Sequence, residues 1–337
     1  MTPDWSQRRI GTGSGVDGLG VTVHELDSGV AGPTVLVLGG VHGNEVGGIV
    51  AAGQLAQTRW PLRAGRLRVV PVTYEAAYYA DSRVGPGDGL NLARVFPGRP
   101  GGSTTERLAH LVGEELLRSA DVLVDLHTSS PDTDMPLFAG CLDDGSAAAN
   151  RAVELALAFG APMVWTHPRL GPGRTLTMAR DLGIPAIYVE SPVGGVLDAG
   201  YLQAYVSGVR GVLVALAMLD DAPVGETLSL WVHGDGDADA ISQVTIGGMF
   251  RADVALLDRV EVGQIVGTVV DSRARPLEQV HAAHTGHVVI LRRLARVSPG
   301  TPVAGIAPAR PELLGLPSDR LVRTSGACRL SAKGGGA

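Results

Sequence analysis

Lysine is nearly absent from this sequence of 337 residues. The single lysine, Lys333, lies in the Gly-rich segment at the end of the chain. The body of the chain therefore has no lysine that could form a Schiff base, bind phosphate in a P-loop, or carry a lipoyl or biotinyl group. These three classes of lysine-dependent protein are excluded, and the cationic chemistry of the folded part falls to arginine.

Cysteine, clustered basic charge and long apolar runs are also scarce. The two cysteines, Cys141 and Cys328, lie far apart in sequence, which argues against a disulfide framework or a thiolate metal site. The formal net charge is −6 and no basic block is present, so non-specific binding of nucleic acid is not expected. The sequence shows neither an apolar run of membrane-spanning length nor an apolar signal core at its beginning. We therefore expect a cytoplasmic protein without a nucleic-acid or membrane partner, and a homo-oligomer stays open.

The apolar segments that are present predict an α/β domain over residues 1–222. Hydrophobic residues make up 45% of the chain and charged residues 18%, as in a globular protein with a large core. Strand-like runs alternate with segments of helical spacing, which is typical of a mixed, mostly parallel sheet with helices on both faces. We expect strands at 21–26, 35–38, 66–72, 121–126, 162–166 and 186–190, and helices at 44–57, 104–118, 146–159, 175–182 and 198–219. The first twenty residues are expected to form a mobile leader.

The pattern of apolar residues in the sequence changes after residue 222. Short Val-rich runs follow at intervals of roughly ten residues, which predicts a small all-β barrel or sandwich over 223–309. Residues 310–337 are expected to form a loosely attached and partly disordered tail. His281, His284 and His287 are spaced in threes, but in a strand this spacing places alternate side chains on opposite faces, so a polar hairpin end is favoured over a second metal site.

Side chains that can bind a metal ion follow the ends of three predicted strands. His42 and Glu45 follow the strand at 35–38, His127 follows 121–126, and Glu190 follows the apolar run AIYV. The carboxyl ends of parallel strands form the edge where α/β proteins place their sites. Two histidines and one carboxylate are the ligands of catalytic zinc in carboxypeptidase A, so we interpret His42, Glu45 and His127 as zinc ligands. The alternative is a polar turn in which Asn44 caps the next helix.

The segment 73–102 is rich in Gly and Pro and has no clear periodicity. A loop of this length inside a compact domain is unusual and is often functional. It contains Arg83, Asn91 and Arg94, followed by the turn FPG. We expect these polar side chains to approach the metal site.

Four motifs together carry a family resemblance. In order they are GGVHGNE, Arg83 followed by DGLNLARVFPG, then DLHT, and GIPAIYVE. This pattern, over about residues 34–195, resembles the succinylglutamate desuccinylase and aspartoacylase family, whose members are relatives of the zinc carboxypeptidases. The resemblance implies a zinc carboxypeptidase-like catalytic domain in 1–222, and the β domain is similar to the barrel, itself like a biotinyl or lipoyl carrier domain, that bacterial members bear.

The resemblance also implies a role for individual residues. His42, Glu45 and His127 match the ligands of one Zn²⁺ ion, and Glu190 matches the catalytic glutamate that acts as general base. The remaining matches are arginines: Arg83 for the scissile carbonyl and oxyanion, Arg94 for a substrate carboxylate, and Arg174 for a further carboxylate contact, with Arg180 competing for the last role.

One position departs from the family pattern. The family has Asn-Leu-Asn-Arg before the FPG turn, whereas this chain has Asn91, Leu92, Ala93 and Arg94. The donor normally next to the arginine is therefore missing. Either Asn91 substitutes for it as a substrate-binding residue, or the substrate lacks a carboxylate at this place.

The expected function is a zinc-dependent hydrolase that cleaves an amide bond. It would remove a small acyl group from an N-acylated amino acid or a related amine, with metal-bound water as nucleophile and Glu190 as general base. A metallocarboxypeptidase acting on a peptide or amide conjugate is the first alternative. A catalytically silent metal-binding scaffold protein, supported by Ala93 alone, is the second.

Overall fold

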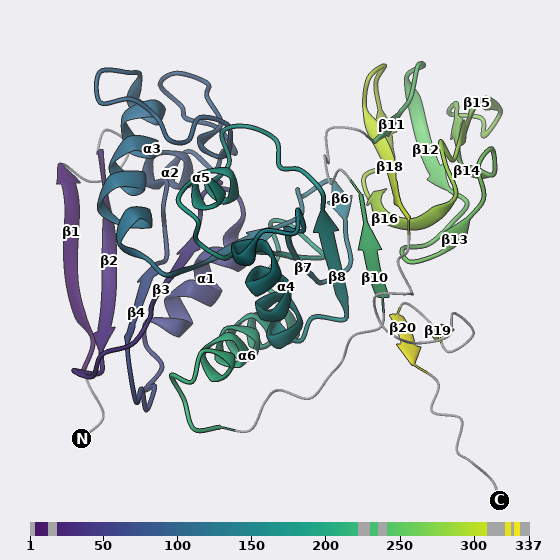
Figure 1. The fold of residues 1–337 in the computed structure, drawn as a ribbon. Coiled ribbons are helices and arrows are strands. Elements are labelled where there is room, and N and C mark those ends of the chain that lie inside the picture. Colours follow the sequence, from purple (N-terminus) through teal and green to yellow (C-terminus); the bar gives the residue numbers. More distant parts are fainter. Residues whose placement is uncertain are drawn as a thin grey trace, which may run out of the picture.

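A computed structural model describes residues 4–12, 19–221, 230–234, 241–308, 321–324 and 327–330. It shows an α/β body, built around one large sheet, and smaller antiparallel sheets beside it from the later part of the chain (Figure 1). The expected fold class is confirmed.

The central sheet contains nine of the described strands. In spatial order they are β1 (Ser6–Thr12), β2 (Leu19–Asp27), β4 (Arg66–Val70), β3 (Thr34–Gly39), β5 (Val122–Thr128), β9 (Ala186–Ser191), β7 (Phe138–Leu142), β8 (Met163–His167) and β10 (Leu230–His233). Strands β4, β3, β5 and β9 run parallel, as do β7, β8 and β10, while β7 is antiparallel to β9. The sheet is therefore mixed and mostly parallel.

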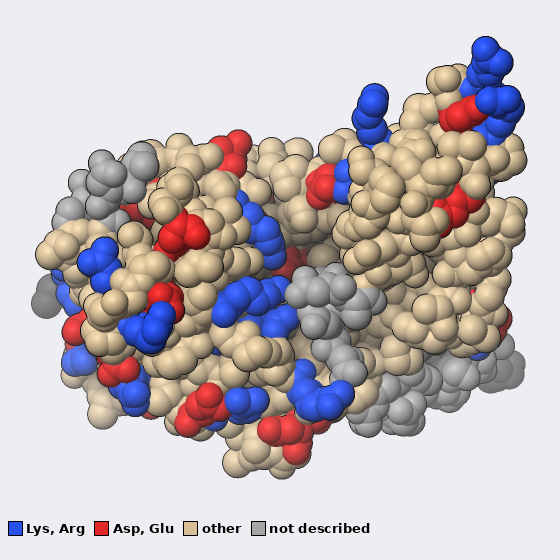
Figure 2. Space-filling view, turned by 90° about the horizontal axis from the view of Figure 1, so that it is seen from above, with Lys and Arg blue, Asp and Glu red and all other residues tan. Residues whose placement is uncertain are grey.

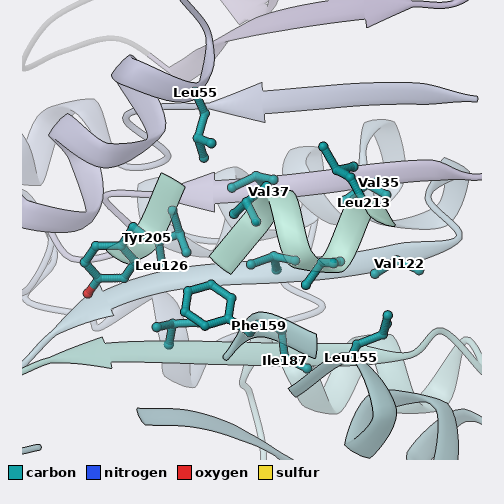
Figure 3. Packing of buried hydrophobic residues seen from close by; sticks show 14 of the residues in the cluster. Val35, Val37, Leu55, Val122, Leu126, Leu155, Phe159, Ile187, Tyr205 and Leu213 are labelled. Carbon is teal, nitrogen blue, oxygen red and sulfur yellow. The ribbon is translucent and has the colours of Figure 1, made fainter. Parts of the chain in front are cut away.

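Helices cover both faces of this sheet. One face carries α1 (Val46–Leu55), α4 (Ala147–Phe159) and α6 (Ala199–Ala215), and the other carries α3 (Thr104–Glu115) and α5 (Thr175–Asp181). Figure 3 shows alternate strand residues such as Val35 and Val37 packing against Leu55 and Leu213 of the helices. Burying each such side chain contributes about 1.5–3 kcal/mol, so these two apolar layers hold the strand ends in place.

Helices α3, α4 and α6 begin at polar residues whose side chains cap them. Ser146 accepts from the backbone of Ala149, and Asp198 accepts from that of Tyr201. At α3 the cap is Ser103, directly before the range 104–118 that was expected for this helix. Ser103 and Glu106 form a reciprocal capping box, which satisfies two backbone N–H groups at once.

Two expectations about strands were wrong. Residues 6–12 were expected to be mobile, but Ser6–Thr12 forms the edge strand β1, in which Ile10 is the one buried residue. The sequence of β1 therefore shows little of the apolar pattern that predicts a strand. Strand β7 lies between the strands expected at 121–126 and 162–166, where none was expected, and it inserts between β8 and β9. Residues 13–18 of the expected leader lie outside the described residues.

The later part of the chain forms two small antiparallel sheets. One contains β11 (Ser242–Gln243), β18 (Pro302–Ala307), β16 (Gly286–Arg292) and β13 (Arg259–Val260), and the other contains β15 (Pro276–His281), β14 (Ile265–Val270), β12 (Gly248–Ala252) and β17 (Arg296–Val297). In the expected tail, β19 (Leu321–Thr324) pairs with β20 (Ala327–Leu330), and the rest of 310–337 lies outside the described residues.

Two strands link the α/β body to the β domain. Strand β6 (Thr133–Asp134) leaves the body and pairs with β16, and an ion pair joins Asp132 to Arg292 beside it. In the other direction, β10 lies beyond residue 222 but extends the central sheet next to β8. The domain boundary expected at 222 and 223 stays a prediction, and strands are exchanged across it.

The three histidines of the β domain do not converge. His281, His284 and His287 each face a different backbone carbonyl, those of Gly263, Ile306 and Leu257. This agrees with a polar hairpin region. Among the described helices, none combines the length and apolar character that crossing a membrane requires.

Candidate metal centre and active site

The turn after β3 brings His42 and Glu45 to the edge of the sheet. Its glycines allow close contact between backbones: a Cβ at Gly43 would lie 2.0 Å from the carbonyl carbon of Ala77, and one at Gly48 would lie 2.4 Å from the backbone oxygen of Leu126. Helix α1 starts directly after Glu45, so this carboxylate sits at the positive end of the helix. Asn44 does not cap the helix, contrary to the polar-turn alternative.

His42, Glu45 and His127 converge into one buried cluster. Nδ1 of His42 lies 2.7 Å from Oε1 of Glu45, and Nδ1 of His127 lies 2.8 Å from Oε2 of the same carboxylate. Within the part of the chain that the structure describes, these three side chains form the one group of histidine, cysteine and acidic residues compact enough to hold a metal ion. Their exposures are 2–7%, so the donor atoms are shielded from bulk water.

The other ring nitrogen of each histidine has a fixed partner. Nε2 of His42 lies 3.0 Å from Oδ1 of Asn91, an oxygen that also accepts from the backbone N–H of Ala93. Nε2 of His127 lies 3.1 Å from Oδ2 of Asp125. Since both oxygens are acceptors, both Nε2 atoms must carry hydrogens.

This arrangement fits a bound cation. In a neutral histidine ring, a protonated Nε2 leaves Nδ1 with a lone pair. The two Nδ1 lone pairs then face the carboxylate of Glu45, and acceptors this close repel unless positive charge lies among them. Nδ1 of His42 is buried and makes no hydrogen bond of acceptable geometry among the described residues. Two imidazole nitrogens and a carboxylate oxygen are a donor set that suits zinc.

Burial and charge shift the pKa values of the cluster in different directions. Burial lowers the pKa of His42. Burial also opposes the charged form of His127, but the carboxylates of Asp125 and Glu45 outweigh it and raise the pKa of that ring well above its usual value. Burial acts to raise the pKa of Glu45, but the two histidines hold it well below its usual range. The cluster therefore keeps Glu45 ionised.

Glu190 lies beside the cluster on the next strand. In the register of β5 and β9, it is paired with His127. Its Oε2 atom is buried without a hydrogen-bond partner among the described residues. Burial and the neighbouring charge of Glu45 raise its pKa to about 8. A carboxylate with this pKa can both take up and release a proton near neutral pH.

A cleft opens in front of the cluster. His42, His127 and Glu190 line it together with Arg83 and Arg94. Figure 2 shows basic side chains gathered along a hollow in this surface, and because the chain has a single lysine near its end, these are arginines. The cleft is suited to a small anionic molecule.

The arginines expected at the site take different positions. Arg83 donates to Oε1 of Glu45 at 2.6 Å and lines the cleft. Arg94 and Arg174 also line it. Arg180 instead contacts the carboxylate of Asp181 and is not among the residues around the cleft. The geometry therefore favours Arg174 over Arg180 as a substrate contact.

Asn91 was expected to bind substrate, but its contacts are with the protein. It is not among the residues that line the cleft, and its oxygen holds His42 as described above. Ala93 does line the cleft and leaves space where the family has a larger side chain. This placement favours a role for Asn91 in orienting a metal ligand, and its contact with substrate stays a prediction.

Sequence reasoning missed one whole side of the cleft. This side is aromatic and contains Phe138 from β7, Trp165 and His167 from β8, and Tyr188 from β9. Phe138 lies against both Trp165 and Tyr188, with ring centroids 5.4 and 5.5 Å apart. His167 lies at the end of a strand, as His127 does. The principle that sites lie at the carboxyl ends of parallel strands could therefore have found it. Arg169, two residues later, was also missed.

The fold and the cluster define an α/β protein with a candidate metal site at the carboxyl edge of a mixed sheet. The family model of the succinylglutamate desuccinylase/aspartoacylase catalytic domain matches residues 31–216. The chain belongs to this family, and the resemblance in the motifs is confirmed. Membership supports deacylase chemistry, the hydrolysis of an amide bond.

Individual relatives agree with this assignment. The chain is 33% identical over 287 residues to N-alpha-acetyl-L-2,4-diaminobutyric acid deacetylase of Halomonas elongata, and the match covers 82% of each protein. A succinylglutamate desuccinylase from Silicibacter sp. TM1040 has a similar structure, with a TM-score of 0.81, 25% identity, and coverage of 91% of this chain and 96% of that one. The product-bound structure of the ectoine utilization protein EutE (DoeB) from Ruegeria pomeroyi is also similar, with a TM-score of 0.80 and 27% sequence identity. The match covers 90% of this chain and 96% of that one.

Proposed function

We propose that the protein is a zinc-dependent amidohydrolase that removes a small acyl group from an N-acylated amino acid. The observation that carries this proposal is the buried cluster of His42, Glu45 and His127, whose two Nδ1 lone pairs converge at the floor of an arginine-lined cleft. The deacetylase activity named for the Halomonas elongata relative supports acetyl as the acyl group.

Each residue of the cluster would contribute one metal ligand. A zinc ion held by these residues would act as a Lewis acid and would make hydroxide available near neutral pH. Asp125 and Asn91 would orient the two histidines through their Nε2–H groups. Thr175 donates to Oδ2 of Asp125 at 2.5 Å and so fixes this carboxylate in turn.

Glu190 is the proposed general base and acid. It must be ionised to take a proton from the attacking water, and positive charge at the neighbouring cluster lowers its pKa towards that state. After the amide bond breaks, the same carboxyl group can return the proton to the leaving amine. Its Oε2 atom is buried beside the cluster, which shields this oxygen from bulk water.

The arginines are proposed to bind and polarise the substrate. Arg83 has one guanidinium nitrogen on Glu45 and lies at the cleft, so it is placed to stabilise an oxyanion formed next to the cluster. Arg94 and Arg174 would bind the carboxylate of the amino acid. Ala93 leaves more room next to Arg94 than the asparagine of the family would.

The test combines metal analysis with a substrate panel. The purified protein should contain one zinc ion per chain and release free amine from N-acetyl amino acids faster than from dipeptides. Faster cleavage of dipeptides would favour a carboxypeptidase. If His42→Ala and His127→Ala retain stoichiometric zinc, the metal site is wrong. A zinc-loaded protein that cleaves neither class would favour a silent scaffold.

A further inference from the structure

The aromatic side of the cleft has a polar centre that the proposed chemistry does not use. Tyr188 lies two residues before Glu190 on β9, so both side chains project from the same face of the sheet. The hydroxyl of Tyr188 lies 2.7 Å from Nε2 of His167. Both residues line the cleft.

A backbone carbonyl fixes the direction of this hydrogen bond. Nδ1 of His167 lies 3.0 Å from the backbone oxygen of Gly234. A carbonyl oxygen only accepts, so Nδ1 must carry the hydrogen, and in a neutral ring Nε2 is then an acceptor. When the ring of His167 is neutral, Tyr188 therefore donates its single hydroxyl hydrogen to Nε2. In that state the Tyr188 oxygen has lone pairs to offer but no hydrogen.

The surrounding packing holds this group in place. A Cβ at Gly140 would lie 2.1 Å from the ring of Tyr188, so the ring occupies space that only glycine leaves on the neighbouring strand. Trp165 and Phe138 join a buried cluster with Val289 and Ile290 of the β domain, and Tyr188 packs against it. The acceptor is thus part of a rigid wall, which is the condition for using it in discrimination.

We propose that Tyr188 is a specificity-determining residue that accepts a hydrogen bond from the side chain of the substrate amino acid. His167 acts through it as a positioning residue. This inference rests on the proposed function and adds a substrate class: N-acyl amino acids whose side chain ends in a hydrogen-bond donor, such as an amino or hydroxyl group. Nε1 of Trp165 is a donor on the same wall, but it is buried and inaccessible.

The experiment compares substrates of equal size but different hydrogen-bonding character. N-acetyl-2,4-diaminobutyrate ends in a donor, N-acetylnorvaline replaces that group with a methyl, and N-acetylaspartate offers only acceptors. The wild-type zinc enzyme should show kcat/KM for the diaminobutyrate compound at least about tenfold above that for norvaline, because a site built to pair a polar group rejects its apolar isostere. Preference for the aspartate compound, or equal rates for the first two, would overturn the proposal.

Two sets of variants separate this role from a structural one. Tyr188→Phe keeps the ring and should remove the preference mainly by raising KM for the donor substrate, with the norvaline compound little affected. His167→Gln can still donate to Gly234 and accept from Tyr188, so it should retain the preference, whereas His167→Leu should lose it. If Tyr188→Phe lowers kcat/KM equally for the donor substrate and the norvaline compound, the hydroxyl serves packing alone.

Failure of the inference differs from failure of the proposed function. If the wild-type protein cleaves no N-acetyl amino acid, the function is wrong. If it cleaves them all and Tyr188→Phe leaves the ratio between donor and methyl substrates unchanged, the function stands and the inference falls.

Discussion

The two sides of the cleft are built in different ways. The metal side takes its cluster from the turn after β3 and from the end of β5, and each histidine is held by an acceptor on its other nitrogen. The aromatic side draws on β7, β8 and β9, and it packs against the β domain. The comparison teaches that the candidate chemistry depends on residues with a local signature, whereas selectivity depends on strands that meet only in the folded protein.

The largest expected effect lies on the metal side. His127→Ala removes one of three proposed ligands, so bound zinc should fall far below one per chain and turnover should fall below detection. His167→Leu, a change of the buried histidine at the end of β8, is the matched control and should keep its zinc. Elemental analysis after gel filtration gives the metal content. Zinc loss in both variants would break the proposed division between the two sides.

Glu190→Gln should separate chemistry from metal binding. The amide keeps the size of the side chain but cannot take up the proton, so kcat should fall by about 10²–10⁴ while zinc content stays unchanged. Steady-state kinetics on N-acetyl amino acids, with metal analysis of the same sample, provide the measurement. An unchanged kcat would remove Glu190 from the catalytic step.

Asp125→Asn tests the contact that orients His127. An amide cannot reproduce the charge of Asp125, and zinc affinity should fall by about 10- to 100-fold, as is usual for such outer contacts. Competition with a chelator of known affinity measures this change. Thr133→Ser, on β6 beside β16, is a control that should not alter affinity, because the side chain of Thr133 is not a partner of the cluster in any contact described above. A loss of similar size there would point to general destabilisation.

The smallest expected effect is on the pH dependence of stability. The pKa of Glu190 rises from its usual 4.5 to about 8 in the folded protein, so folding favours the protonated carboxyl group. The stability that this group contributes is fully present below about pH 4.5 and is lost as pH rises through 8.

Thermal unfolding of the zinc-free protein, measured between pH 5.5 and 8.5, checks this directly. The wild-type Tm should fall relative to that of Glu190→Gln as pH rises. Parallel Tm profiles for the two proteins would show that the raised pKa of Glu190 is wrong.

The sequence predicted elements with strong periodicity better than those at edges. The helices α1, α3, α4, α5 and α6 were expected close to where they lie, because apolar residues recur in them at helical spacing. Polar caps also mark the starts of α3, α4 and α6. Strand β7 was missed because it is short and surrounded by turn residues, and its buried character comes from the strands on both sides. Strand β1 was missed because all of its residues except Ile10 are exposed, so its sequence lacks the apolar alternation that predicts a strand.

The residues of the candidate site also differ in how well the sequence predicted them. His42, Glu45 and His127 could be found because each follows an apolar strand in a recognisable motif, and the structure brings them together. The roles of Asp125 and Asn91 in holding the histidines could not be resolved, since the direction of a side chain depends on its neighbours in space. For Arg174 and Arg180, six residues apart, position at the cleft separated them.

Four properties follow from the sequence alone: the α/β class, the order of the motifs, the membership in a deacylase family, and the set of residues that could bind a metal. These properties depend on residue type and on spacing along the chain. Only the folded structure shows that Nδ1 of both histidines in the cluster faces Glu45 and that Ala93 rather than Asn91 lines the cleft. It also shows that the hydroxyl of Tyr188 lies against Nε2 of His167. These properties depend on contacts between residues that are far apart in sequence. Such contacts form only when the strands pack together.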